Sequence, residues 1–217
     1  MIDDRIAYLD REFEAGSSYL PNKADWLAGS WTGIKKAYGD DRRGETAVDL
    51  DLLRQIGTRM TSLPDDMTLN KKLMRIINAR ADNISNGSGI DWATAEHLAF
   101  GSILMEGNPV RLSGQDSCRG TFSQRHAVFV DQVTENRYTP LNHLADNQAF
   151  FEVIDSPLSE ASVMGFEYGF SQVEPNALVM WEAQFGDFAN GAQVVVDQFI
   201  SSGEAKWLRM NLSLIHI

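Results

Sequence analysis

The fold of this chain is predicted most directly by residues 150–183, FFEVIDSPLSEASVMGFEYGFSQVEPNALVMWEA. This stretch begins and ends with short apolar runs, 150–155 and 177–183, whose β-branched and aromatic side chains are typical of β-strands. Between these runs, residues 159–170 follow a helical pattern. A strand, a helix and a second strand in this order are typical of a parallel sheet with a crossover helix, so the stretch predicts an α/β fold.

The same alternation continues on both sides of this stretch. Residues 110–114 and 127–133 have the length and composition of strands, and a helix over 187–203 precedes a further strand over 206–210. We therefore predict an α/β domain with a parallel sheet from residue 90 onward. Ligands of such sheets bind beyond the carboxyl ends of the strands, which here are followed by the loops SGQDS, IDSPLSE and EAQFGDF.

Residues 1–89 predict a linker with helices rather than a second sheet. Residues 49–60 and 71–84 place apolar side chains at helical spacing. Asp91 is expected to cap the N-terminus of a third helix, which ends before Gly107. The region before the sheet is therefore expected to be mostly helical.

The composition is that of a globular protein and argues against several classes of partner. The 217 residues are 43% hydrophobic and 23% charged. With 19 Lys and Arg against 30 Asp and Glu, the net charge of −11 repels phosphate and anionic lipid, so neither nucleic acid nor a membrane is an expected partner. Cys118 is the only cysteine, which precludes an internal disulfide. Together with the charged start MIDDRIAYLDREFE, this predicts a cytoplasmic protein.

The common short motifs of enzymes are absent from the sequence. Gly87 and Gly89 follow a polar helix and lack the third glycine of a dinucleotide-binding fingerprint. The sequence has no Walker loop and no zincin histidine pair, and residues 169–173 do not complete a nucleophile elbow. His97 in a helix and His143 in a loop are therefore expected to be structural or surface histidines.

Three long segments resemble a known family. They are RLSGQDSCRGTFSQRHAV (111–128), SPLSEASVMGFEYGF (156–170) and WEAQFGDFANGAQVVVDQFISSGEAKW (181–207). AGSSYLPNKADWLAGSWTG and GIDWATAEHLAFGSILMEGNPVRLSG extend the likeness over nearly the whole chain. In these segments the chain resembles the decarboxylating first component of 2-oxoglutarate dehydrogenase.

The resemblance implies an activity, cofactors and partners. Enzymes of this family use thiamine diphosphate and Mg²⁺ to decarboxylate 2-oxoglutarate oxidatively in the citric acid cycle complex. They transfer the succinyl group to a lipoyl group on the succinyltransferase component. The resemblance further implies a homodimer in the bacterial cytoplasm, and a pyrimidine-binding α/β domain over residues 90–210 preceded by the linker 1–89.

Glu160 is the catalytic and cofactor-binding residue that the resemblance implies. Related enzymes place a glutamate here against the pyrimidine ring nitrogen of thiamine diphosphate, where it promotes the tautomer that deprotonates the thiazolium carbon. A carboxyl group does this best in a dry, apolar site, and Leu158, Val163 and Met164 are apolar neighbours. The alternative is an acidic residue that only complements the helix dipole.

Phe185 and Phe188 are the cofactor-binding aromatic residues that the resemblance implies, because related enzymes stack an aromatic ring of this loop on the aminopyrimidine. The sequence leaves open which of the two does so. Phe188 continues the apolar stripe of Ala192 and Val195, which favours a core position for Phe188 and the stacking role for Phe185.

The loop GQDSCRGTFSQRHAV brings Arg119, Arg125 and His126 to the mouth of the site implied by the resemblance. Arginine binds carboxylates in a bidentate manner, and histidine donates to a developing enolate or a distal carboxylate. His126 is the preferred catalytic and substrate-binding residue, and Arg125 is a second substrate ligand. The alternative is that the ring of His126 packs against the sheet.

Several parts of the family pattern are missing. No Gly-Asp-Gly motif with a following metal-binding Asn occurs, so no metal ligand is assigned and the Mg²⁺ ligands are expected on an upstream domain. The domain over 90–210 is expected to be incomplete, and residues 211–217, which end in LSLIHI, to be a non-native tail. The polypeptide is therefore expected to be an inactive fragment.

Two other functions stay open at this point. One is another thiamine diphosphate enzyme, of the transketolase type or of the pyruvate or branched-chain 2-oxoacid dehydrogenase type. The other is a noncatalytic α/β binding module.

Overall fold

The computed structural model describes residues 2–18, 29–34, 39, 44–207, 210–211 and 213–216. It divides into two compact units, Met1–Lys36 and Ala37–Ile217. The smaller unit contains helix α1, Ile2–Gly16, and the 3-10 turn η1, Gly29–Trp31. Every residue of α1 is exposed, including the apolar side chains of Ile6 and Phe13.

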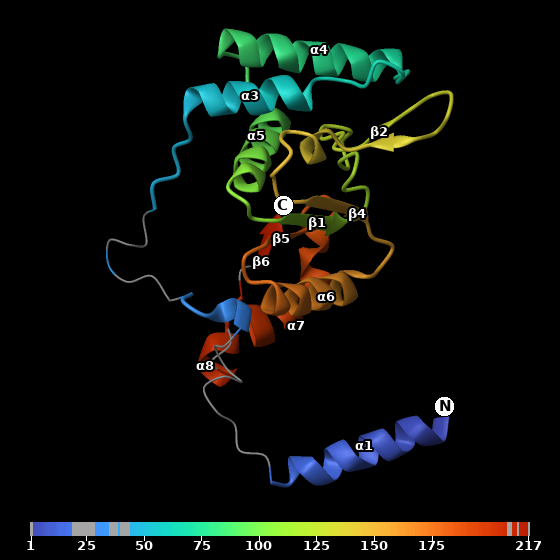
Figure 1. The fold of residues 1–217 in the computed structure, drawn as a ribbon, viewed down its shortest axis with the longest axis vertical. Helices are drawn as coiled ribbons and strands as arrows, with labels where there is room; N and C mark the ends of the chain where they lie inside the picture. Colours follow the sequence, from blue (N-terminus) through green and yellow to red (C-terminus); the bar gives the residue numbers. More distant parts are fainter. Residues whose placement is uncertain are drawn as a thin grey trace. The chain divides into compact units, whose positions relative to one another are not determined.

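The larger unit begins with three helices, α3 (Leu50–Met60), α4 (Lys71–Asn86) and α5 (Trp92–Met105) (Figure 1). They confirm the helices expected from the sequence. Each begins at a side chain that accepts a backbone N–H: Asp49 accepts from Asp51 at 2.9 Å, Asn70 from Lys72 at 2.9 Å, and Asp91 from Thr94 at 2.7 Å.

A four-stranded sheet in the order β4-β1-β5-β6 forms the centre of the larger unit. Its strands are β1 (Val110–Gly114), β4 (Phe151–Asp155), β5 (Leu178–Glu182) and β6 (Ser213–His216). All neighbouring pairs are parallel, with Leu112 opposite Val153 on one side and Met180 on the other. The predicted α/β fold with a parallel sheet is confirmed.

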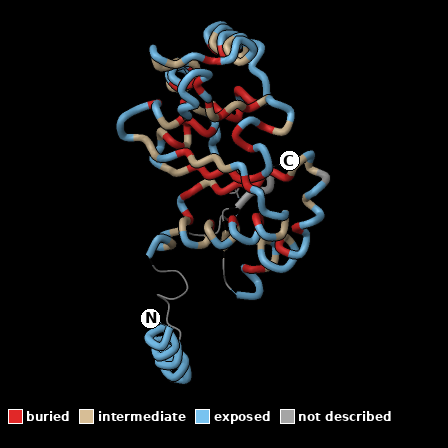
Figure 2. The backbone as a smooth tube through the Cα atoms, turned by 90° about the vertical axis from the view of Figure 1, so that its right-hand side faces the viewer, coloured by how far each residue is buried: buried red, intermediate tan, exposed pale blue. Residues whose placement is uncertain are grey.

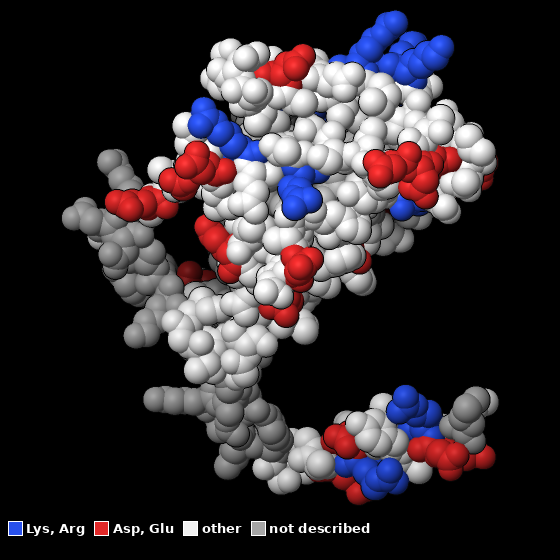
Figure 3. All heavy atoms as spheres, turned by 45° about the horizontal axis from the view of Figure 1, so that its top comes forward, with Lys and Arg blue, Asp and Glu red and all other residues white. Residues whose placement is uncertain are grey.

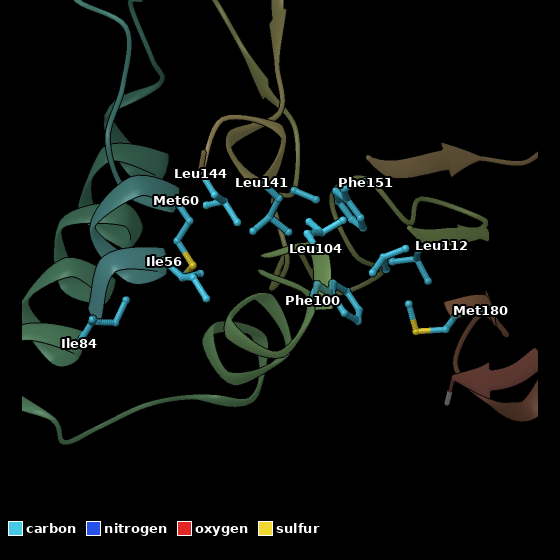
Figure 4. Close-up of a cluster of buried hydrophobic side chains, with 12 residues drawn as sticks. Ile56, Met60, Ile84, Phe100, Leu104, Leu112, Leu141, Leu144, Phe151 and Met180 are labelled. Carbon is cyan, nitrogen blue, oxygen red and sulfur yellow. The ribbon is translucent and has the colours of Figure 1, made fainter. Parts of the chain in front are cut away.

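Helices cover both faces of this sheet (Figure 1). Helix α6, Glu160–Val173, crosses from β4 to β5 and packs Val163 and Met164 against Trp181. On the opposite face, Phe100 and Leu104 of α5 pack against Leu112 and Met180 (Figure 4). Successive residues of a strand point to opposite faces, which places Met180 in one core and Trp181 in the other. Figure 2 shows this buried layer along the strands.

The strand expected over 127–133 is wrong as a member of the parallel sheet. Only β2, Phe129–Val130, is extended, and it pairs antiparallel with β3, Arg137–Tyr138, in a separate two-stranded sheet. The Asp131 carboxylate ends β2, because it accepts the backbone N–H groups of Val133 and Thr134 at 2.8 and 2.7 Å. The short 3-10 turn η3, Pro140–Asn142, follows.

The expected helix over 187–203 is wrong as a continuous α-helix. The segment divides into a 3-10 turn η4 (Asp187–Ala192), a short α7 (Gln193–Val195) and a π-turn η5 (Val196–Ile200). Gly186 precedes it with a φ of 72°, and Gly191 lies inside it, so a regular helix is disfavoured at its start.

The strand expected over 206–210 is also wrong where the structure describes it. Residues 206 and 207 belong to helix α8, Gly203–Trp207, and residues 208 and 209 lie outside the described residues. The backbone N–H of Lys206 donates to the carbonyl oxygen of Ser202 at 3.0 Å, which is the hydrogen bond of an α-helix and not of an extended strand. The fourth strand is β6, inside the segment expected to be a non-native tail, and the origin of that segment stays a prediction.

The distribution of basic side chains and the apolarity of the helices are two further properties of the structure. On the face drawn in Figure 3, the described Lys and Arg side chains lie in small separate groups rather than in one continuous basic surface. Among the helices of the described residues, none combines the length and apolarity that crossing a bilayer requires.

Candidate functional site

The loops after β1, β4 and β5 lie together at the carboxyl ends of the sheet, as predicted. Gly114 at the end of β1 shows how closely they approach, since a Cβ there would lie 2.4 Å from the carbonyl oxygen of Glu182 and 2.8 Å from Ser117 Oγ. Its φ of 150° also disfavours any other residue. The strand ends therefore meet without intervening side chains.

Glu160 begins α6 at this edge of the sheet, after the N-cap residue Ser159. Its half-buried side chain helps to line a cavity of about 10 Å³, together with Leu158 and Val163. A cavity of this size has room for a single water. Gly191 of η4 lies against the same side chain, because a Cβ at 191 would be 3.1 Å from Glu160 Cβ and 3.2 Å from Oε2.

Phe185 and Phe188 both present their rings to solvent near this cavity. Phe185 is 54% exposed and Phe188 47% exposed, and their ring centroids are 6.4 Å apart. The expected core position of Phe188 is therefore wrong: Ala192 and Val195 of its stripe are buried, but the broken helix turns Phe188 away from them. Phe185, at a φ of 57°, also meets Phe122 edge to face at 5.7 Å.

A second, larger pocket of about 180 Å³ opens beside Phe185. Its rim is aromatic, with Trp92 and Phe122 both largely exposed. Its buried wall is charged. The residues that line it are Trp92, Glu96, Thr121, Phe122, Gln124, Arg125, Glu182, Ala183, Phe185 and Gly186.

Arg125 lies in the wall of this pocket and is only 1% exposed. Its guanidinium binds Glu96 in a bidentate manner, at 2.7 Å from Nε and 3.0 Å from Nη2, and also pairs with Glu182. Nη1 donates to the carbonyl oxygen of Ser117 at 3.0 Å. Burial alone would lower the pKa of Arg125, but the hydrogen bonds and charges of the two glutamates outweigh it and raise this pKa.

The geometry thus gives Arg125 internal partners. All three nitrogens of its guanidinium donate within the protein, which suits a residue that fixes the loop more than one that receives a substrate carboxylate. Its role as a substrate ligand stays a prediction. Arg119, by contrast, is exposed and forms a surface ion pair with Asp116 at 3.0 Å.

His126 follows Arg125 in a left-handed conformation, with a φ of 48°, and its ring is half-buried. Burial lowers the pKa of His126, and the positive charge of Arg80 lowers it further. The ring is therefore neutral near pH 7 and has one nitrogen that donates and one that accepts. The ring also forms a hydrogen bond with the backbone of Ser123, and the lining of the pocket includes Gln124 and Arg125 but not His126, so its role as a substrate ligand stays a prediction.

The remaining candidates have structural positions. His97 is buried and its Nδ1 lies 2.7 Å from the carbonyl oxygen of Ala93, while the exposed His143 stacks on Tyr138 at 4.6 Å. Both agree with the roles expected from the sequence. Burial raises the pKa of Cys118 to about 11, so its thiol stays protonated at neutral pH.

Sequence reasoning missed Glu96, Glu182 and Arg80, which fix the loops of the site. The available signal was their setting, because Glu182 ends the apolar run ALVMWE and Glu96 lies in the apolar helix WATAEHLAF. A charged residue in such a setting needs a buried partner. The partner could not be identified, since Arg125 lies 29 positions from Glu96 and 57 from Glu182.

The part of the chain that the structure describes contains no group of three or more His, Cys, Asp or Glu side chains placed to hold a metal ion.

The sequence of this chain matches a known family and several known proteins. The family described as "Transketolase, pyrimidine binding domain" matches residues 88–216. The chain is 58% identical over 205 residues to the 2-oxoglutarate dehydrogenase E1 component of Brucella anthropi, and 59% identical to those of Brucella canis and Brucella suis. Each alignment covers 94% of this chain and 20% of the relative, so the chain spans about a fifth of the length of the relatives it matches.

The residues matched by the family run from just before α5 to the end of β6, and thus include the sheet and all three loops of the site. Because this match covers more than half of the chain, the chain belongs to the family of transketolase pyrimidine-binding domains.

Proposed function

We propose that this chain is part of a thiamine diphosphate-dependent 2-oxoglutarate dehydrogenase and supplies the pyrimidine half of its cofactor site. The identity of 58–59% to E1 components over 94% of the chain supports the enzyme, and the matched family supports the pyrimidine half. In this proposal the complete protein is a homodimer of the bacterial cytoplasm. It decarboxylates 2-oxoglutarate oxidatively and passes the succinyl group to a lipoyl group of the succinyltransferase component.

One observation supports the proposal most strongly: Glu160, at the start of the helix after β4, and the exposed ring of Phe185, in the loop after β5, both lie at the carboxyl edge of the sheet, where Glu160 lines the small cavity and Phe185 the larger pocket. A carboxyl group and a free aromatic face are what an aminopyrimidine needs, a hydrogen-bond partner for a ring nitrogen and a surface for stacking. Glu160 and Phe185 therefore supply the two kinds of group that this part of the cofactor requires.

Each residue then has a defined task. Thiamine diphosphate, when bound, supplies an electron sink for the carbanion that decarboxylation leaves. Glu160 would hold the pyrimidine ring nitrogen and share a proton with it, and Phe185 or Phe188 would stack on the ring. His126 would contact the substrate, and Arg125 would fix its loop. The ligands of Mg²⁺ are proposed to lie outside this chain.

Titration of the complete protein with thiamine diphosphate, with and without Mg²⁺, tests this proposal when it is followed by a panel of 2-oxoacids. The expected result is Mg²⁺-dependent binding and decarboxylation of 2-oxoglutarate in preference to pyruvate and branched-chain 2-oxoacids. A preference for another 2-oxoacid would show a different thiamine diphosphate enzyme. The absence of cofactor binding would show a noncatalytic module. Purified residues 1–217 alone are expected to be inactive.

A further inference from the structure

The loop between β1 and β2, residues 115–128, has an unusual backbone conformation, although hydrogen bonds within the loop, such as those from the N–H groups of Arg125 and His126 to the carbonyl oxygen of Arg119, contribute to its shape. Three of its non-glycine residues, Asp116, Ser123 and His126, have left-handed φ values of 57°, 56° and 48°. Such conformations are uncommon and persist only where the surroundings hold them. Contacts from outside the loop are therefore expected near His126.

Arg80 of α4 contacts the loop at that point. Its side chain is only 5% exposed, and it donates from Nη1 to the carbonyl oxygen of Arg125 at 3.0 Å and from Nη2 to the carbonyl oxygen of Gln124. These are the two carbonyl groups directly before His126. The fork of the guanidinium therefore fixes two successive peptide groups, which a single-point donor could not do.

The buried position of Arg80 carries a cost in the stability of the fold. Its Nε is buried and has no hydrogen-bond partner among the described residues, and burial lowers its pKa despite the attraction of Asp91 and Glu96. Burying a cation with an unsatisfied donor lowers the stability of the folded protein. Its two good contacts both lie on the loop backbone, which points to a role in the shape of the loop.

Arg125 anchors the same part of the loop. Its side chain ties the loop to α5 through Glu96 and to the end of β5 through Glu182. In the same loop, Phe122 meets Phe185 edge to face. Arg80 thus ties the loop to α4, and Arg125 ties it to α5 and the end of β5, at the residues directly before His126.

We propose that Arg80 is a positioning residue, which holds the loop 115–128 in the shape that presents His126 and Phe122 to the candidate site. The helix α4, expected from the sequence to be only part of a linker, then sets the geometry of the site. The role of the loop in substrate binding rests on the proposed function, but the holding of the loop by Arg80 does not.

The test compares R80Q and R80K with wild type in the complete protein, and uses R75Q as the matched control. Arg75 is an exposed arginine on the same helix. Amide hydrogen exchange is followed in the loop and in strands β1 and β5. In R80Q, exchange at residues 122–127 should rise by about tenfold or more while the strands keep wild-type rates. R80K should lie between wild type and R80Q, and R75Q should match wild type.

A second readout separates positioning from a general loss of stability. In R80Q, kcat/KM for 2-oxoglutarate should fall by about tenfold or more, whereas the Kd for thiamine diphosphate should stay within about twofold. Unchanged exchange in both Arg80 variants, or an equal rise in loop and strands, would overturn the positioning role. Wild-type protein that binds no thiamine diphosphate would contradict the proposed function and leave the exchange result standing.

Discussion

Gly191 of η4 lies so close to Glu160 at the start of α6 that a Cβ at position 191 would be 3.1 Å from the Cβ of Glu160. Along the chain, Glu160 belongs to the helix that precedes β5, and Gly191 belongs to the turn that follows β5. The position of the Glu160 carboxylate is therefore set by a neighbour that has no side chain.

The variant G191A should displace Glu160 by a few tenths of an ångström and lower kcat of the complete protein by about tenfold or more. The matched control is G165A inside α6, where an added Cβ meets no atom within 4 Å. It should keep kcat and gain about 0.5–1 kcal/mol of stability from helix propensity. Steady-state kinetics and urea unfolding measure both effects. An unchanged kcat in G191A would mean that the exact position of Glu160 does not matter.

Removal of Arg125 should destabilise the domain strongly. R125M leaves the carboxylates of Glu96 and Glu182 buried without their cation, which costs about 3–5 kcal/mol in comparable buried pairs. R119M removes the exposed ion pair with Asp116 and the exposed hydrogen bonds to Thr121 and Ser123, and should cost less, about 1 kcal/mol. Urea unfolding of the two variants checks the difference, and equal losses would show that the buried pairs are not what holds the loop.

The stability of the domain should depend on pH through His97. Burial lowers the pKa of His97 from 6.5 to about 4, so this histidine is neutral in the folded protein and becomes protonated on unfolding between these values. Its contribution is complete above pH 6.5 and is lost as the pH falls toward 4, by about 3 kcal/mol in total.

The variant H97Q should therefore unfold with a flatter pH dependence between pH 4 and 7 than wild type, measured by urea unfolding at several pH values. The glutamine amide can still donate to the carbonyl oxygen of Ala93, which keeps the packing comparable. Identical slopes in the two proteins would contradict the buried neutral state of His97.

The two phenylalanines should differ in their effect on the cofactor. Phe185 lines the larger pocket and is supported by Phe122, so F185A should weaken thiamine diphosphate binding by about three- to tenfold, the size of one aromatic stacking contact. F188A should have a smaller effect. Calorimetric titration of the complete protein measures both, and a larger loss in F188A would assign the stacking ring to Phe188.

The parallel sheet could be predicted from local sequence because β1, β4 and β5 are short and apolar, and because a helical pattern lies between β4 and β5. The errors arose where one side chain or glycine overrides the pattern. Asp131 ends an apparent strand by accepting two backbone N–H groups, and glycines disturb the helix after β5. The spacing of apolar residues along the sequence does not reveal such hydrogen bonds or glycine conformations.

The candidate site was predictable only in part. Glu160, Phe185 and Phe188 were proposed because their segments, 156–170 and 181–207, resemble a known family, and their roles stay predictions. The network of Arg125 with Glu96 and Glu182, and the reach of Arg80 across 44 positions to Gln124, depend on tertiary packing. The sequence shows that such charged residues occur in apolar surroundings, but not which of them pair.

The most direct test of the central claim is hydrogen exchange at the thiazolium carbon of thiamine diphosphate bound to the complete protein, measured by NMR after acid quench in wild type and in E160Q. The matched control is E106Q, which changes an exposed glutamate at the end of α5. We predict fast exchange in wild type and E106Q, and in E160Q exchange slower by about a hundredfold or more, as loss of acid–base participation requires. Fast exchange in folded, cofactor-bound E160Q would contradict the role of Glu160.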